Sequence, residues 1–266
     1  MGFQILEPEG LREKNGYLAG NDSHRVKILH ELLDNSEVDC IWAARGGYGL
    51  HRIIDKIDVD KLTKGNKLIV GFSDICALHA LIQNRTKLLS IHGPVITQLS
   101  TFEESQIQQV KHVIQNEWST LTYNSTQQSI VTGSCEGTLV GGCLSVVAPL
   151  VGSEFMPPLE NSILLLEDVG ETVYRVDRLL QQLRLAGVFE RISGIALGEF
   201  YGCEPRNTDE PDLMTMIKQV VGHLSIPVAA GLPFGHGAIN EAIPLGAHAT
   251  LEATDTACTL VVKRNG

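Results

Sequence analysis

The sequence predicts an α/β protein with two domains, the first built on a parallel, Rossmann-like sheet and the second mixing helices and strands. Three features predict this fold class. In the first half of the chain, apolar runs enter turns that are followed by helical patterns, as in parallel strand–helix units. After residue 119 the chain becomes polar, which indicates a boundary. Near the C-terminus, apolar and polar residues alternate with β-branched types, as in half-buried strands.

The first domain is predicted to alternate short strands with helices. Its strands are runs that are apolar on both faces, which is typical of a sheet covered on both sides. Its first helix follows Asn21 or Asp22 as N-cap and has an apolar face. Strands are expected at 38–44, 67–70 and 88–91, and helices at 22–33, 50–57, 75–83 and 102–118.

The polar stretch 120–129 has no helical period and indicates a linker. We therefore divide the chain into an N-terminal domain (1–119), a linker (120–132) and a C-terminal domain (133–266). In the second domain, strands are expected at 137–142, 162–166, 195–200 and 226–230, helices at 144–150 and 173–185, and terminal strands within 249–262.

The N-terminus does not begin as α/β domains usually do, with a buried strand and helix. Residues 1–6 are expected to form the second strand of the sheet, with the first strand missing from the chain. The chain is therefore expected to be a truncated form.

Composition excludes several function classes. The chain of 266 residues carries 21 basic and 31 acidic side chains, a net charge of −10, so we expect neither nucleic acid nor an anionic membrane as a partner. No apolar run is long enough to span a membrane, and no signal peptide is visible, which predicts a cytoplasmic protein. The six cysteines form no Cys-x-x-Cys pair and no metal-ligand spacing occurs, so no metal and no cofactor are expected.

Ser73 is the candidate nucleophile. An apolar strand enters the turn Gly71-Phe72-Ser73-Asp74, and a helix follows, so the hydroxyl is lifted clear of the sheet and the Asp74 N–H can stabilise an oxyanion. The match to Gly-x-Ser-x-Gly is partial because Ile75 replaces the last glycine. The alternative is that Ser73 or Asp74 only caps the helix.

A serine nucleophile needs a base and an acid that orients it. Glu167 ends an apolar strand, where open α/β sheets present functional groups, although Asp168 or Glu171 is an alternative. His236 lies between two glycines in a loop and is the candidate base. The other histidines lie mostly on helical patterns or apolar strands, where hydrogen-bonded structural roles are expected: His24, His30, His51, His79, His92, His112, His223 and His248.

The turn after the first strand, Arg45-Gly46-Gly47-Tyr48-Gly49, indicates a close approach of the backbone to another group. It does not have the spacing of a nucleotide-binding loop. A second oxyanion donor at Gly46 or Gly47, a substrate contact and a purely steric turn remain open.

These motifs together resemble the LD-carboxypeptidases, serine peptidases that include muramoyltetrapeptide carboxypeptidase and the microcin C immunity peptidases. The resemblance covers nearly the whole chain in family order. It is carried by Asn15–Gly20, Ala44–Gly49, Gly71–Asp74, Leu139–Gly142, Leu166–Glu171, Tyr174–Arg178, Pro233–His236 and Pro244–Gly246.

The resemblance implies a Ser73–Glu167–His236 triad, a C-terminal domain with a β-rich core and a homodimer with its site between the two domains. It implies release of a terminal D-alanine from small cell-wall peptides and no metal. A carboxypeptidase must also hold a free carboxylate, for which Arg45, Arg175 and Arg178 are candidates that the sequence does not rank.

Two departures from the family accompany these matches. Family members normally begin with a further strand and helix, which are expected to be missing here before residues 1–6. In addition, Cys143 stands where an asparagine usually follows the glycine pair. Two alternatives to a murein peptidase stay open. One keeps the triad and takes a peptidyl-nucleotide antibiotic, and an aromatic side chain near the active-site loop would favour it. The other is a truncated or non-catalytic small-molecule-binding homologue.

Overall fold

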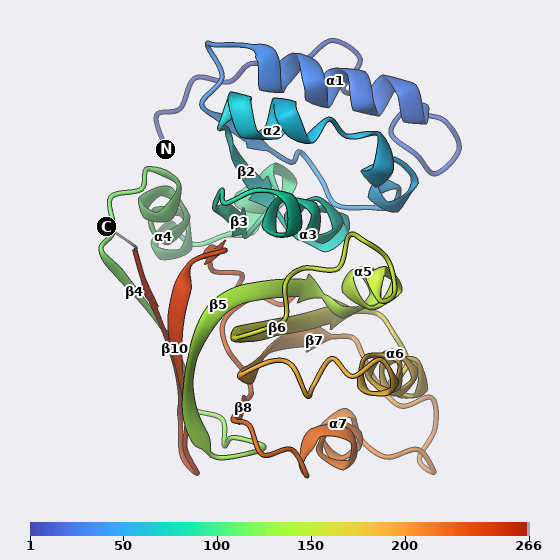
Figure 1. Cartoon of the computed structure of the whole chain (residues 1–266), viewed down its shortest axis with the longest axis vertical. Helices are drawn as coiled ribbons and strands as arrows, with labels where there is room; N and C mark the ends of the chain where they lie inside the picture. Colours follow the sequence, from blue (N-terminus) through green and yellow to red (C-terminus); the bar gives the residue numbers. More distant parts are fainter. Residues whose placement is uncertain (265–266) are drawn as a thin grey trace.

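The computed structural model describes residues 1–264. It has two sheets that lie one after the other along the long axis of the molecule. The first half of the chain supplies most of a four-stranded sheet with its helices, and the second half supplies most of a larger sheet of seven strands (Figure 1). The α/β fold class is therefore confirmed.

The smaller sheet has the order β1-β2-β3-β9. The first three strands are parallel, as their apolar sequences predicted, and β9 pairs antiparallel to β3. Because β9 comes from the second half of the chain, the two halves share this sheet. The strands are β1 (Cys40–Trp42), β2 (Leu68–Gly71), β3 (Ser90–His92) and β9 (Ile243–Leu245), and the helices are α1 (Asp22–Asp34), α2 (Val59–Gly65), α3 (Cys76–Arg85) and α4 (Glu104–Ile114).

The larger sheet is half antiparallel and half parallel, with the order β4-β11-β10-β5-β6-β7-β8. The long strand β5 (Gly133–Cys143) joins the halves: its first part pairs antiparallel with β10 and its second part parallel with β6. Figure 1 shows β5 bending as it passes between them. The other strands are β4 (Thr120–Ser125), β6 (Ser162–Val169), β7 (Gly194–Tyr201), β8 (Val228–Ala229), β10 (His248–Ala253) and β11 (Cys258–Lys263).

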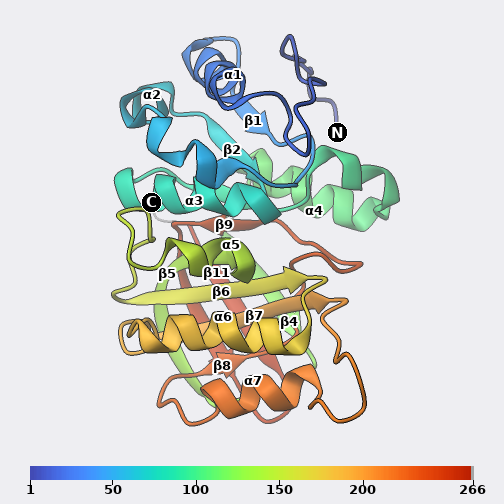
Figure 2. The same ribbon diagram turned by 90° about the vertical axis from the view of Figure 1, so that its right-hand side faces the viewer.

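Helices α6 (Val173–Leu185) and α7 (Leu213–Val221) cover one face of the parallel half (Figure 2). Val176, Leu180 and Leu183 of α6 are buried against β6 and β7, since the spacing of three and four residues places them on one face. The short helix α5 (Leu144–Val147) follows β5 directly. The core between these helices and the sheet fixes the end of β6, which carries Glu167.

Most predicted elements are present, some with shorter bounds and others, such as β5, β6 and β7, with longer ones. The helix at 173–185 is confirmed with its bounds, whereas 50–57 forms two short 3₁₀ turns, Leu50–Arg52 and Ile54–Lys56. The helix predicted at 102–118 ends at Ile114. The sequence analysis did not predict α2, α7 or β9.

The stretch expected to be an irregular linker contains strand β4. Leu121, Tyr123 and Ser125 are buried while the residues between them are exposed, so the strand has one polar face. β4 pairs only with β11 and lies at the edge of the sheet, which explains why its composition resembles a loop.

Residues 1–6 are not a strand, contrary to the prediction. Ile5 is 87% exposed, because these residues pair with no strand of the sheet, and Phe3 makes an edge contact with Trp42. None of the helices in the described range 1–264 is both long and apolar enough to cross a membrane.

Candidate active site

Ser73 follows β2 at a sharp turn, as the sequence predicted. Its backbone has φ +61°, and the three other non-glycine residues with positive φ in the described chain are asparagines, which tolerate this conformation. Ser73 opens a short 3₁₀ turn that leads directly into α3. A strained serine between a strand and a helix is the geometry of a nucleophile elbow.

The glycine-rich turn after β1 lies against Ser73. A Cβ atom placed on Gly46 would lie 3.0 Å from Cβ and 3.2 Å from Oγ of Ser73, so only glycine leaves the hydroxyl undisturbed. Within residues 1–264, the N–H groups of Gly46 and Gly47 donate to no other group. The turn is held in place by the Leu50 N–H, which donates to Asp74 Oδ2 at 3.0 Å.

Asp74 therefore has a structural role through its side chain. Burial raises the pKa of its carboxyl group, and the hydrogen bonds from Leu50 and Gly49 offset this only in part. Its ionisation is thus less favourable in the folded protein than in the unfolded chain. The penalty is absent below the unfolded pKa of 3.8 and grows as pH rises through the folded pKa.

We expect Asp74→Asn to be more thermostable than the native protein at pH 7, because asparagine keeps an acceptor for Leu50 and carries no charge. A rise in Tm of about 2–4 °C would correspond to about 1 kcal/mol in a chain of this size. Thermal unfolding near pH 3 should show little difference. Asp74→Ala, which loses the acceptor, should instead melt below the native protein; a lower Tm for Asp74→Asn at pH 7 contradicts this account.

His236 and Glu167 form a close pair. His236 Nδ1 lies 2.6 Å from Glu167 Oε2, and the imidazole is 14% exposed while the carboxylate is fully buried. The loop approaches this closely because Gly235, at φ +115°, has no Cβ; a Cβ would lie 2.8 Å from the same carboxylate oxygen. The loop is attached to β7 through the Glu199 N–H, which donates to the Phe234 carbonyl.

The pair lies beside the nucleophile turn. The His236 ring packs against the ring of Phe72, the residue immediately before Ser73, with ring centroids 4.4 Å apart and a tilt of 48°. The structure thus brings three predicted residues into one region: the nucleophile from the turn after β2, the base from the loop after β8 and the acid from β6.

Glu167 remains ionised although it is buried. Burial raises the pKa of its carboxyl group, but the hydrogen bond from His236 and the proximity of His236 and His92 outweigh this, and the pKa lies below the ordinary value. An ionised carboxylate on Nδ1 leaves Nε2 of His236 free to act as a base.

Asp168 and Glu171, the alternatives to Glu167, have other partners. Asp168 accepts hydrogen bonds from the backbone N–H and the hydroxyl of Ser145, so it connects β6 to the start of α5. The Sγ of Cys143 also faces Asp168, at 3.5 Å from Oδ1. Glu171 pairs with Arg175 at 3.4 Å. Neither carboxylate bonds to His236.

The three candidate arginines lie in different places. Arg45 is exposed and directly precedes Gly46, which contacts Ser73. Arg175 lies on α6, paired with Glu171 and the Tyr174 hydroxyl. Arg178, one turn further along α6, lines a shallow depression with Gln182 and Leu185.

His92 is the residue that the sequence analysis misjudged. It was expected to be a hydrogen-bonded structural histidine, yet both ring nitrogens are buried without a hydrogen-bond partner and Nε2 lies 3.8 Å from Glu167 Oε1. A signal was available: His92 ends β3, the neighbour of the strand that leads to Ser73. For other histidines the expectation is correct, since His79 Nε2 bonds the Gly71 carbonyl and His51 Nε2 that of Val146.

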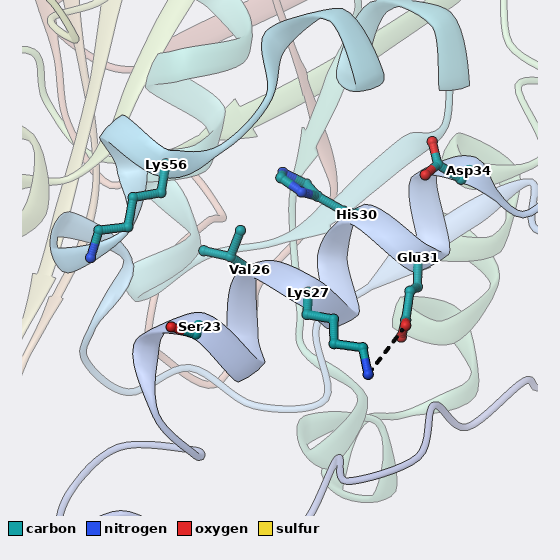
Figure 3. Close-up of a pocket in the computed structure, with 7 residues that line it drawn as sticks. All are labelled: Ser23, Val26, Lys27, His30, Glu31, Asp34 and Lys56. Atoms are coloured by element: carbon teal, nitrogen blue, oxygen red, sulfur yellow. Dashed lines mark ion pairs between the residues drawn. The ribbon is translucent and has the colours of Figure 1, made fainter.

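One surface depression lies away from the candidate site residues. A depression along α1 is lined by residues that include Lys27, His30 and Asp34, and by none of the candidate site residues (Figure 3). Within the described part of the chain, no group of three or more His, Cys, Asp and Glu side chains could hold a metal ion.

Family models match both halves of the chain: the LD-carboxypeptidase N-terminal domain over residues 1–93 and the C-terminal domain over residues 136–251. A protein of Synechocystis sp. is 36% identical over 94% of this chain and 82% of its own length. The chain belongs to the LD-carboxypeptidase family.

Other family members have more specific names. The murein tetrapeptide carboxypeptidase of Pseudomonas aeruginosa is 33% identical over 89% of this chain and 80% of its own length. The crystal structure of muramoyltetrapeptide carboxypeptidase from Oxalobacter formigenes matches with a TM-score of 0.89 at 28% identity, covering 99% of this chain and 90% of that one. The microcin C7 self-immunity protein of Escherichia coli is 26% identical over 92% of this chain and 80% of its own length. This LD-carboxypeptidase therefore has relatives in both branches.

Proposed function

We propose that this LD-carboxypeptidase is a serine peptidase that removes the terminal D-alanine from murein tetrapeptides through Ser73, His236 and Glu167. The observation that carries the proposal is the 2.6 Å contact between His236 and Glu167 beside the strained turn of Ser73. The similarity to the carboxypeptidases named for murein tetrapeptide and muramoyltetrapeptide supports the substrate class. The family resemblance also implies a homodimer that acts in the cytoplasm during recycling of cell-wall peptides.

In the proposed mechanism, Ser73 Oγ attacks the carbonyl carbon of the scissile amide. His236 Nε2 takes the hydroxyl proton and later donates a proton to the leaving amine of D-alanine. Glu167 keeps the imidazole in the correct tautomer and stabilises its positive charge. Water then attacks the acyl-enzyme and releases the tripeptide, with His236 again acting as the base.

The oxyanion and the substrate carboxylate need their own donors. We assign the oxyanion to the Asp74 N–H together with a Gly46 or Gly47 N–H, because the glycine turn lies against Ser73 with free donors. For the terminal carboxylate we favour Arg45 over Arg175 and Arg178, since Arg45 is adjacent to the turn that contacts Ser73 and is not paired with Glu171.

A peptidyl-nucleotide substrate is the second candidate, favoured by one surface feature. Neither tryptophan of the chain is a candidate for stacking on a base, because Trp118 is buried and Trp42 donates its Nε1–H to the Pro94 carbonyl. Tyr48, in the glycine-rich turn, instead forms an exposed aromatic pair with Tyr17, with ring centroids 5.7 Å apart. Such a pair can stack on a nucleobase or cover a peptide.

The deciding experiment offers purified protein both substrate classes, a murein tetrapeptide and an aminoacyl-sulfamoyl nucleoside, at equal concentration. Released D-alanine and released amino acid are quantified by chromatography. We expect the kcat/KM for the tetrapeptide to exceed that for the nucleoside. Cleavage of the nucleoside alone would favour the second candidate function, a peptidyl-nucleotide peptidase. Cleavage of neither substrate by a protein that unfolds cooperatively would refute both functions.

A further inference from the structure

His92 and Glu167 are buried groups that face each other without any other partner. Both side chains are fully buried, and His92 Nε2 lies 3.8 Å from Glu167 Oε1. Oε1 has no hydrogen-bond donor in the described structure, and neither have the ring nitrogens of His92 any partner. An unpaired oxygen on a buried carboxylate is unfavourable, so the two groups stabilise each other if Nε2 carries a proton.

Aromatic rings hold the His92 imidazole in this place. The rings of Phe72 and Phe234 pack edge-on against it, with centroids at 5.8 and 5.6 Å. Phe72 precedes Ser73, and Phe234 belongs to the loop that carries His236. His92 is therefore enclosed by the two segments that supply the nucleophile and the base, and its own strand fixes its backbone.

The remaining polar groups around Glu167 are engaged elsewhere. His236, from the loop, uses the other carboxylate oxygen, Oε2. Asp168, adjacent on β6, bonds Ser145. Cys76, on α3, accepts the N–H of Cys143 at the end of β5, and burial raises the pKa of both thiols. His79, on α3, bonds the Gly71 carbonyl. Among these groups, His92 alone faces Oε1 without another partner.

We propose that His92 is a positioning residue that donates a hydrogen bond from Nε2 to Glu167 Oε1 and so holds Oε2 toward His236 Nδ1. The inference rests on the proposed function, since it assigns Glu167 the role of orienting the base. The contact of 3.8 Å shortens when substrate binds, as hydrogen bonds of catalytic sites commonly do. In this arrangement Glu167 lies between two histidines, one that reacts and one that fixes it.

The first test uses the native protein without substrate, so it does not depend on the proposed activity. Long-range ¹H–¹⁵N NMR of histidine-labelled protein reports which ring nitrogen of each histidine carries a proton. We expect His92 to be protonated at Nε2, and we expect a downfield proton from the short His236–Glu167 bond. His92 with a bare Nε2 overturns the proposal.

The second test compares three variants. His92→Phe keeps a ring between Phe72 and Phe234 but removes the donor, whereas His92→Gln places an amide N–H near the position of Nε2. We expect kcat to fall roughly 10- to 100-fold in His92→Phe with KM nearly unchanged, because the buried ring cannot touch substrate and only the base is misaligned. The downfield proton should disappear in His92→Phe and return, with most of kcat, in His92→Gln.

The matched control is His79→Phe, the same exchange at a second buried histidine that does not contact Glu167. It should lower Tm but retain the downfield proton. The proposal is refuted if the downfield proton and the native kcat are both retained in His92→Phe. It is also refuted if His92→Gln loses as much of kcat and of the downfield signal as His92→Phe does. If the native protein releases no D-alanine, the proposed function fails, while the NMR measurements still decide the role of His92. If His92→Phe does not fold, the tautomer in the native protein decides it.

Discussion

Ser73→Ala is expected to reduce release of D-alanine from a murein tetrapeptide by about six orders of magnitude in kcat, to below detection. The reason is that Ser73 carries the one hydroxyl of the turn Gly71-Phe72-Ser73-Asp74, so without it the acyl-enzyme cannot form. The loss has the size seen when other serine hydrolases lose their nucleophile. Substrate binding should persist, because alanine leaves the surrounding turn unchanged. The measurement is chromatographic detection of D-alanine together with calorimetric titration of the substrate.

Ser90→Ala is the matched control for this variant. Ser90 is a buried serine on the neighbouring strand β3, its hydroxyl has no hydrogen-bond partner, and it plays no part in the proposed chemistry. It should retain activity close to that of the native protein. Ser73→Gly provides a further check, since glycine relieves the positive φ of Ser73 and should melt higher than Ser73→Ala. Residual activity in Ser73→Ala above one hundredth of native would exclude a serine mechanism at this residue.

Glu167→Gln is expected to lower kcat by about 10⁴-fold while the protein remains folded, by comparison with removal of the orienting acid in other serine peptidases. The physical reason is the 2.6 Å contact with His236 Nδ1. A neutral amide can face Nδ1 with its NH₂ group, which selects the tautomer with its proton on Nε2, and it stabilises the imidazolium less. Steady-state kinetics at several pH values, with thermal unfolding in parallel, measure the effect.

Asp168→Asn separates this role from a general need for buried charge. Asp168 is the adjacent buried carboxylate, and it bonds Ser145 instead of His236. We expect Asp168→Asn to change Tm more than kcat, and Glu167→Gln to do the opposite. If Asp168→Asn were the inactive variant and Glu167→Gln the active one, the acid of the triad would be reassigned.

The sequence alone predicted the helices and strands that bury a continuous apolar face, because such burial leaves a periodic pattern of apolar residues. The helix at 173–185 and the strand from 162 followed from apolar periodicity, because each buries a continuous apolar face. Strand β4 was taken for a linker because it lies at the sheet edge and every second residue is exposed. Strand β9 has only three residues and exists through its pairing with β3, a contact about 150 residues apart in the chain that no local pattern encodes.

The candidate site divides in the same way. Ser73, Glu167 and His236 were recognisable because each occupies a distinctive local setting: a strand–helix turn, a strand end and a glycine-flanked loop. His92 had a weaker signal, namely its place at the end of a strand, because a histidine in an apolar strand otherwise looks like a core residue. Its importance depends on an unpaired carboxylate oxygen that comes from a strand of the other sheet.

The sequence by itself determined which residue types and turns this LD-carboxypeptidase possesses, because turn geometry and apolar periodicity depend on neighbours within a few positions. Only the tertiary structure decided which of them meet. It paired Glu167, and neither Asp168 nor Glu171, with His236, placed Gly46 against Ser73, and set His92 beside the Glu167 carboxylate. The physical reason is that hydrogen bonding and desolvation act over a few ångströms in space. The chain brings residues 72, 92, 167 and 236 to that range only when the two sheets pack together.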